Sequence, residues 1–337
     1  MLPDAKMRLI ARLALAAAAL ALSGCYYLHL AAGQLEMNRR REPIVDLVAR
    51  DDTDAALRRR LGYASRARDF AISDLGLPDN GSYRSYADLG RPYATWNLFA
   101  APEFSVKPQR WCFPVAGCVA YRGYFEEQRA ARAARHMAGK GRDVYIGPSL
   151  AYSTLGHLRD PVLNTMLRYG DAELAALIFH ELAHQAAYIP GDSDFNEAFA
   201  TVVENEGARR WLTHLGRSDD LTAFLASSRR EQEFAELMAA SRARLATLYA
   251  SSSPTEEMRA AKTAELARLR DSMTALGLQS AGDLNNARLA AVATYHRCVP
   301  ALTALLAEHG GNLPAYYSAI RALARDSAAR NLLCANR

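Results

Sequence analysis

Residues Asp171–Gln185 read DAELAALIFHELAHQ and contain the pentad HELAH. On an α-helix, residues four positions apart lie on the same face, so His180 and His184 can direct two imidazole nitrogens at one metal ion. Glu181 lies one position further round, where its carboxylate could take a proton from a metal-bound water. Two histidines with ordinary hydrogen bonds are a weaker explanation, because a Glu inside an apolar helix needs a partner. The stretch therefore predicts a site for one Zn²⁺ ion.

The residues around the pentad predict how far this helix extends. Asp171 follows Gly170 as an N-cap, and Pro190-Gly191 stops the helix. An apolar stripe at helical spacing runs between them, formed by Leu174, Ala175, Leu177 and Ile178.

A catalytic zinc ion takes three protein ligands and keeps one position for water, so a third ligand must follow the pentad. After Pro190-Gly191, Asp194 and Glu197 have capping-box spacing and predict a second helix that runs to about Gly216. Glu197 lies on its first turn, and Glu204 is seven residues further on the same face. Either carboxylate could reach the metal. Glu204 is alternatively a solvated surface charge or a residue that orients a ligand histidine.

The first 24 residues indicate a lipoprotein signal peptide rather than part of the fold. Basic residues precede an Ala/Leu-rich run at 13–22, and Leu22-Ser23-Gly24-Cys25 resembles a bacterial lipobox. The run is too short for a comfortable membrane span, which favours lipidation of Cys25 over a plain secretory signal or an uncleaved anchor. Tyr26 rather than Asp follows the cysteine, and by resemblance to known lipoprotein sorting this predicts the outer membrane, facing the periplasm.

Four further cysteines remain if Cys25 carries lipid, and an even number in an oxidising periplasm predicts two disulfides. We expect Cys112 to pair with Cys118 and Cys298 with Cys334, because each pair closes a loop within one segment. Four unpaired buried thiols are the alternative. A four-thiolate zinc site is disfavoured, since no pair has Cys-x-x-Cys spacing.

The remaining sequence predicts an α+β fold that is predominantly helical, in one domain over residues 25–337. Residues 26–77 have helical periodicity, broken at Pro43, and 78–130 contain short alternating runs that predict a small antiparallel sheet. Residues 218–282 predict a long helical hairpin inserted in this domain, which could cover the cleft. The formal net charge of +5 is mild and no basic stripe stands out, so nucleic acid is not an expected partner.

Two segments supply candidate substrate contacts. A strand is expected over 144–149 and again over 151–156, just before the pentad helix, so Tyr152, Ser153 and Thr154 are candidates to bind peptide as an added strand. In the helix that starts near residue 285, Arg288 and Tyr295 lie seven apart and face the same way. Tyr295 is our candidate oxyanion donor and Arg288 a candidate substrate contact, although a Tyr in an apolar helix is more often part of a core.

HELAHQ followed by FNEAFA (195–200) resembles the thermolysin-like and aminopeptidase zincins, and this resemblance implies that Glu197 is the third ligand. The gap from His184 to Glu197 is shorter than in those families. Together with YSTLG (152–156), CFPVAGCVAYRGYF (112–125) and NNARLA (285–290), these motifs resemble a bacterial family of predicted lipoproteins described as zinc aminopeptidases, over nearly the whole mature chain. The Gly-x-Met-Glu-Asn strand, with which well-studied zinc aminopeptidases grip a free N-terminus, is absent, so exo- and endopeptidase action both stay open.

The leading hypothesis is therefore a lipid-anchored zinc metallopeptidase of the bacterial cell envelope, with a zincin-like core and a peptide substrate. The competing hypothesis is a non-catalytic zinc-containing envelope protein that binds or assembles other proteins, with a fourth protein ligand in place of water. The sequence carries no signal of oligomeric state.

Overall fold

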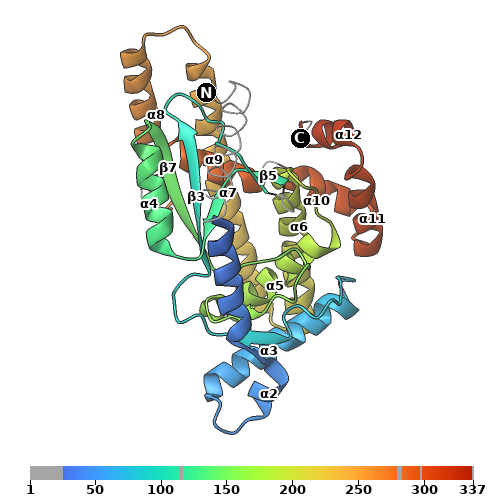
Figure 1. Ribbon diagram of the computed structural model, residues 1–337. Coiled ribbons are helices and arrows are strands. Elements are labelled where there is room, and N and C mark those ends of the chain that lie inside the picture. Colours follow the sequence, from blue (N-terminus) through green and yellow to red (C-terminus); the bar gives the residue numbers. More distant parts are fainter. Residues whose placement is uncertain (1–25, 114–116, 279–282, 297, 336–337) are drawn as a thin grey trace, which may run out of the picture.

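The computed structural model describes residues 26–113, 117–278, 283–296 and 298–335, and it is mostly helical with small sheets, as predicted. A first helix spans 26–39. The other helices, drawn in Figure 1, are α2 (Ile44–Ala49), α3 (Ala55–Ser73), α4 (Glu127–Ala138), the 3-10 turn η1 (Met166–Arg168), α5 (Asp171–Ala186), α6 (Ser193–His214), α7 (Ser218–Tyr249), α8 (Thr255–Ala275), α9 (Asn286–His296), α10 (Val299–Glu308), α11 (Leu313–Leu323) and α12 (Ser327–Ala335).

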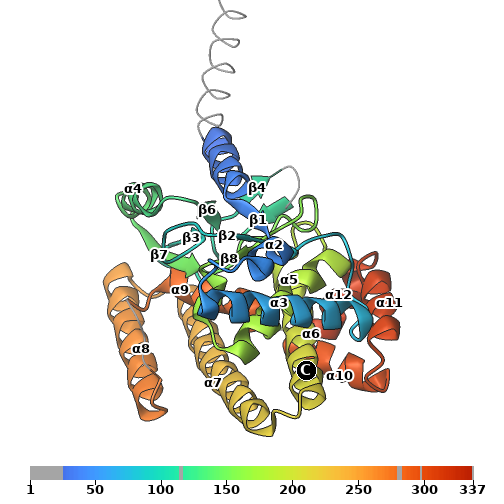
Figure 2. The same ribbon diagram turned by 90° about the horizontal axis from the view of Figure 1, so that it is seen from below.

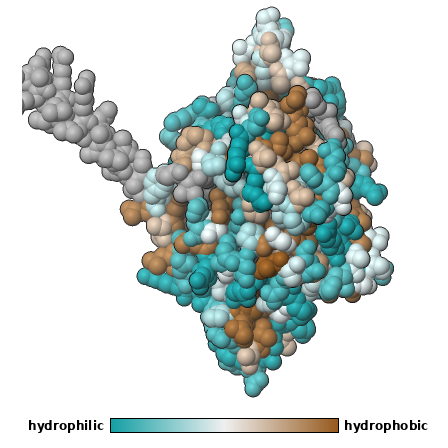
Figure 3. Space-filling model, turned by 90° about the vertical axis from the view of Figure 1, so that its right-hand side faces the viewer, coloured by the Kyte–Doolittle hydropathy of each residue, from teal (hydrophilic) through white to brown (hydrophobic). Residues whose placement is uncertain are grey.

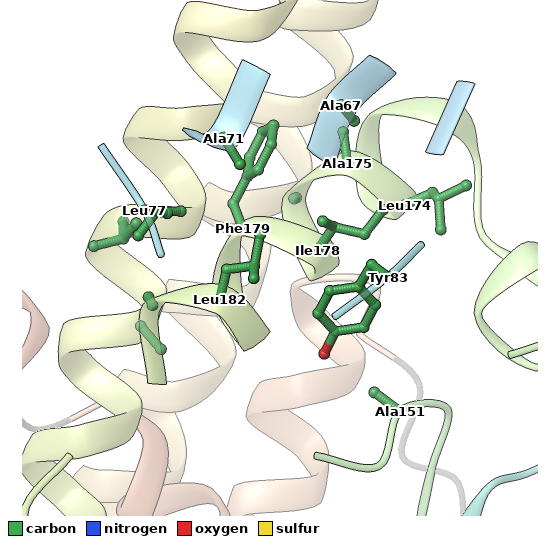
Figure 4. Close-up of a cluster of buried hydrophobic side chains, with 14 of the residues drawn as sticks. Ala67, Ala71, Leu77, Tyr83, Ala151, Leu174, Ala175, Ile178, Phe179 and Leu182 are labelled. Carbon is green, nitrogen blue, oxygen red and sulfur yellow. The ribbon is translucent and has the colours of Figure 1, made fainter. Parts of the chain in front are cut away.

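Helices α5 and α6 form the centre of the molecule, with α3 packed against α5. The apolar face of α5 presents Leu174, Ile178, Phe179 and Leu182, which are fully buried. Figure 4 shows these side chains between α3 and the ring of Tyr83. Because each large aliphatic or aromatic side chain contributes about 1.5–3 kcal/mol when buried, this interface fixes the position of the pentad helix.

Both central helices begin and end slightly differently from the expectation. The N-cap of α5 is Gly170, and α5 ends at Ala186, before Pro190-Gly191. The N-cap of α6 is Asp192, whose carboxylate accepts a hydrogen bond from the backbone N–H of Phe195, so the predicted cap at Asp194 was wrong by two residues. Because α6 starts earlier, at Ser193, Glu197 is its fifth residue and lies just beyond the first turn on which it was expected.

An antiparallel sheet has the order β6-β3-β7 and lies between two helices. Its central strand alternates: Trp96 and Leu98 pack with α4, whereas Phe99 and Ala101 pack with α9. Thr95 and Asn97, on the same side as Phe99, line a cavity described below. The strands are β3 (Thr95–Pro102), β6 (Arg122–Tyr124) and β7 (Arg142–Ser149).

The segment 78–130, predicted to form one small antiparallel sheet, contributes to two further small sheets as well. Strand β1 (Arg41–Pro43) pairs antiparallel with β2 (Ser85–Ala87), which pairs parallel with β8 (Val162–Leu163), and β4 (Trp111–Phe113) pairs with β5 (Gly117–Val119). Strand β1 interrupts a segment predicted to be entirely helical. The predicted strand over 151–156 is wrong: this segment contains no strand, because its polar groups bond within a loop around Asp160.

Two disulfides join the cysteines as expected. Cys112 pairs with Cys118 across β4 and β5, and Cys298 pairs with Cys334 to join the start of α10 to α12. The alternative of four unpaired thiols is therefore wrong.

The predicted helical hairpin consists of α7 and α8, and it lies on the opposite side of the molecule from α11 (Figures 1 and 2). The face that carries α10–α12 is mostly hydrophilic, with separate apolar patches (Figure 3). None of the described helices is both long and apolar enough to cross a membrane.

The helix over 26–39 packs closely on the sheet region. A Cβ atom added at Gly33 would lie 2.1 Å from the Cδ2 atom of Phe125, so only glycine permits this approach. Gly62, inside α3, offers a contrast, because its added Cβ would meet only the end of Arg66 at 3.8 Å.

We expect Gly33→Ala to destabilise the fold by about 1–3 kcal/mol through overpacking, and Gly62→Ala to stabilise it by about 0.5–1 kcal/mol through reduced backbone entropy of the unfolded chain. Chemical denaturation of both variants measures the two changes. A neutral Gly33→Ala would show that the helix over 26–39 can shift away from Phe125.

Candidate metal centre

Three side chains from α5 and α6 bring ligand atoms together. The Nε2 atoms of His180 and His184 are 3.2 Å apart, and Oε2 of Glu197 lies 3.4 Å and 3.8 Å from them. Donors at about 2.0–2.1 Å from a tetrahedral zinc ion are roughly 3.3 Å apart, so this triangle has the size that zinc requires. Among the described residues this cluster contains three candidate ligands, the number found in catalytic zinc sites.

Glu204 lies on the other side of the first histidine. Its Oε2 atom is 2.8 Å from Nδ1 of His180, two turns along α6 from Glu197. A proton on Nδ1 is then shared with the carboxylate, and the lone pair of Nε2 faces the other two donors. This contact agrees with the expectation that Glu204 orients a ligand histidine.

The charges of the cluster favour a cation. Burial lowers the pKa of His180, but its hydrogen bonds to Glu197 and Glu204 outweigh burial and hold that pKa well above its usual value. Burial and the adjacent His180 lower the pKa of His184 to about 4, which leaves a neutral imidazole with a free lone pair. Burial raises the pKa of Glu197, but the two histidines outweigh it and keep the carboxylate ionised. An ionised carboxylate beside two imidazoles therefore suits a divalent ion.

Glu181 lies beside this cluster without belonging to it. Burial raises its pKa to about 7; His180 opposes this, while Glu197 and Asp160 add to it. A hydrogen bond from Ser153 also lowers this pKa. A carboxyl group in this range can both accept and return a proton at neutral pH.

A cavity of about 900 Å³ opens onto the candidate ligands and Glu181. Its walls come from segments far apart in the sequence: the helix over 26–39, strands β3, β6 and β7, the loop at 150–158, and helices α5 and α6. No Lys or Arg belongs to the described part of this wall, and its carboxylates are Glu181, Glu197 and Glu204. Aromatic side chains make up much of the rest: Tyr26, Tyr27, Tyr93, Phe113, Tyr121, Phe125, Tyr152, Tyr169 and Tyr188.

The predicted peptide contacts in the 151–156 segment all line the cavity. The ring of Tyr152 packs on Phe125 with centroids 4.8 Å apart. The hydroxyl of Thr154 donates to Asp160 at 2.8 Å and its backbone N–H donates to the same carboxylate, so Thr154 mainly holds the loop. Ser153, next to Glu181, is the best placed of the three to meet a substrate.

The two candidates on α9 have different outcomes. Arg288 is not among the cavity-lining residues; its guanidinium carbon lies 5.3 Å from the ring centroid of Tyr145 on β7. The prediction that Arg288 contacts the substrate is therefore not supported by its position. The side chain of Tyr295 lies outside the described residues, as does Cys25.

Two tyrosines missed by the sequence reasoning face the cluster. Tyr121, between β5 and β6, has its pKa raised by burial and by Glu197, Tyr188 and Glu181. Tyr188 has its pKa raised by burial and by Glu197, and its ring centroid is 6.3 Å from that of His184. Tyr188 follows His184 by four residues, which was a usable signal. Tyr121 lies within the quoted motif CFPVAGCVAYRGYF, but nothing in that motif separates it from the other aromatic residues, because its approach depends on the sheet.

The helical hairpin does not cover the cavity, since no residue of α7 or α8 lines it. The alternative of a non-catalytic zinc-containing envelope protein needs a fourth protein ligand or a blocked water position on the metal. A cluster of three donors with an open cavity beside it does not favour that alternative.

The match to known families agrees with a peptidase. The model of the family described as "Putative aminopeptidase" matches residues 25–332. The chain therefore belongs to this family, and membership points to peptidase activity. Comparisons with curated proteins and with solved structures return no match.

We expect Glu204→Gln to weaken zinc binding about 10- to 100-fold, because the variant loses the negative charge that supports His180. Competition with a chelator of known affinity measures the change. The control is Glu206→Gln. Glu206 lies two residues further along α6, and its carboxylate pairs with Arg209 and Arg210, so this change should leave the zinc affinity unchanged. Equal zinc affinities of the two variants would show that Glu204 does not support the metal site.

Proposed function

We propose that this protein is a zinc metallopeptidase with a zincin-like core, in which His180, His184 and Glu197 hold one Zn²⁺ ion. The main support is the convergence of three donor atoms, 3.2–3.8 Å apart, with Glu181 beside them in the wall of one large cavity. The family to which the chain belongs supports the same reaction class.

Zinc, when bound, polarises the scissile carbonyl and makes a coordinated water more acidic. Glu181 accepts a proton from the attacking water and later returns it to the leaving amine. Its burial supports this role, because a carboxyl with a pKa near 7 loses and regains a proton readily at neutral pH. Ser153 holds the carboxyl group in position.

Tyr121 and Tyr188 are the proposed donors to the negative charge that develops on the carbonyl oxygen. Both line the cavity and both remain protonated, since burial and the nearby carboxylates raise their pKa values. A hydrogen-bond donor at this point of the reaction typically contributes about 10²–10³-fold in rate.

The charges of the cavity support action at an amino end rather than a carboxyl end. A free C-terminal carboxylate needs a cation to receive it, and the described part of the wall contains no Lys or Arg. An N-terminal ammonium group meets no opposing cationic side chain there, and its approach does not require Glu181, Glu197 or Glu204 to leave the roles assigned to them above. We therefore propose aminopeptidase activity, consistent with the description of the family.

We also propose that the mature chain begins at Cys25, which is lipidated and anchors the protein to the outer membrane, facing the periplasm. The support is the Leu-Ser-Gly-Cys sequence at 22–25 after a short apolar run, together with two disulfides that suit an oxidising compartment.

Replacing Glu181 with Gln should abolish hydrolysis of a mixed peptide library while zinc stays bound, because the amide cannot accept the proton from water. Mass spectrometry of the products tests both parts of the proposal, since removal of single residues from free amino ends identifies an aminopeptidase. Glu173→Gln, in the first turn of the same helix and outside the cavity wall, serves as the control. Full activity of Glu181→Gln would refute the mechanism.

Tyr121→Phe should lower kcat about 10²–10³-fold with little change in KM or in zinc content, because the lost hydroxyl acts only in the transition state. Tyr188→Phe is measured beside it, so that the larger loss identifies the main donor. If neither substitution lowers kcat, the donor must be another group.

A further inference from the structure

The residue that directly follows the proposed anchor is part of the cavity wall. Tyr26 is 8% exposed, its hydroxyl donates to the backbone oxygen of Gly123 at 2.9 Å, and the guanidinium carbon of Arg122 lies 3.8 Å from its ring centroid. The rings of Phe113 and Tyr124 pack on two other sides, with centroids 5.9 Å and 5.8 Å away. Tyr26 is therefore fixed to the body of the protein.

The helix that Tyr26 begins is fixed along its length. His29 is 6% exposed and its Nε2 accepts a hydrogen bond from the backbone N–H of Phe125 at 3.0 Å. Gly33 lies against the ring of Phe125, and Met37 is fully buried. These residues recur every three or four positions, so one whole face of the helix is packed. No flexible tether separates position 25 from the catalytic body.

Exposed apolar side chains gather at the same end. Tyr27 and Leu158 line the cavity and yet are each 44% exposed, and Leu28, beside Tyr27, is 70% exposed. Large apolar groups on a protein surface commonly mark a contact with a membrane or another protein. A lipid attached one residue before Tyr26 would be anchored about 4 Å from Tyr26, measured between Cα atoms, and therefore close to Tyr27 and Leu28 in the chain. A membrane that holds this lipid would then lie beside Tyr27 and Leu28, and Leu158 belongs to the same cavity wall as Tyr27.

We propose that the cavity mouth rests on the bilayer and that the substrate is a polypeptide segment lying at the membrane surface, rather than a freely diffusing peptide. This inference rests on the proposed function and on lipidation of Cys25. A protein on a long linker would sample the periplasm in all orientations. Here the rigid junction keeps Glu181 and the candidate ligands at one distance from the membrane, so segments next to the bilayer are presented to them.

The position of the rim is measured on full-length lipidated protein in vesicles, with lipidation verified by mass. An environment-sensitive fluorophore on Leu158→Cys should be quenched by lipids that carry a quencher in the interface. The same label on Leu225→Cys, a position on α7 that is 43% exposed and outside the cavity wall, should not be quenched. Equal quenching at both positions, or protein without lipid on Cys25, would overturn the proposal.

A variant with a flexible 15-residue Gly/Ser insert between Cys25 and Tyr26 tests the rigid junction. Quenching at position 158 should fall to the level of position 225, while the activity on a soluble peptide stays unchanged. Retained quenching would show that the rim binds the membrane without help from the junction, and would overturn the proposed role of the junction.

The substrate class is tested with two acylated peptides in the same vesicles, which share one cleavable sequence found in the library. Both peptides keep a free amino end and carry the acyl group near the C-terminus; in one peptide the cleavable sequence lies within a few residues of the acyl group, and in the other a 20-residue spacer separates them. The native protein should cleave the first at least tenfold faster, and the insert variant should lose this preference. Equal rates in the native protein would overturn the proposal, whereas absence of any cleaved peptide would instead refute the proposed function.

Discussion

The packing of α5 against α6 is the constraint on which the site depends. It places two imidazoles from one helix opposite two carboxylates from the next, in surroundings where an isolated charge would be costly. Glu197 and Glu204 lie seven residues apart on one face of α6 and approach His180 through its two different ring nitrogens. Neither helix could rotate without separating these groups, so the apolar interface and the polar cluster specify the same arrangement. The wide cavity beside them leaves the cluster accessible.

The pentad and its helix could be predicted because they follow from local periodicity, and the two disulfides followed from loop length and parity. Glu197 was predicted as the third ligand from a resemblance, because helical spacing alone allowed Glu204 equally well. The errors have local causes. The side chain of Asp192, not Asp194, caps α6. The 151–156 segment forms hydrogen bonds to Asp160 instead of pairing with a strand. Arg288 faces Tyr145, a contact that depends on the packing of α9 against the sheet.

The cavity could not have been predicted as a whole. Its wall combines residues from the helix over 26–39, the sheet and the central helices, spread from Tyr26 to Glu204 in the chain. Tyr121 belongs to this wall only because β6 pairs with β3. Such a composite wall also explains why the resemblance extends over nearly the whole mature chain, as does the family match, although only the pentad carries distinctive chemistry.

The C-terminal region is joined to the start of α6 at one point. Arg330 on α12 donates to the carboxylate of Asp192 at 3.1 Å, and Asp192 also caps α6, in which Glu197 is the fifth residue. The bond between Cys298 and Cys334 restrains α12. The disulfide thus supports the placement of α6, which carries the candidate ligand Glu197. A chain folded in a reducing compartment would lack this restraint, so oxidation of two cysteines in the C-terminal region bears on the geometry of the candidate metal site.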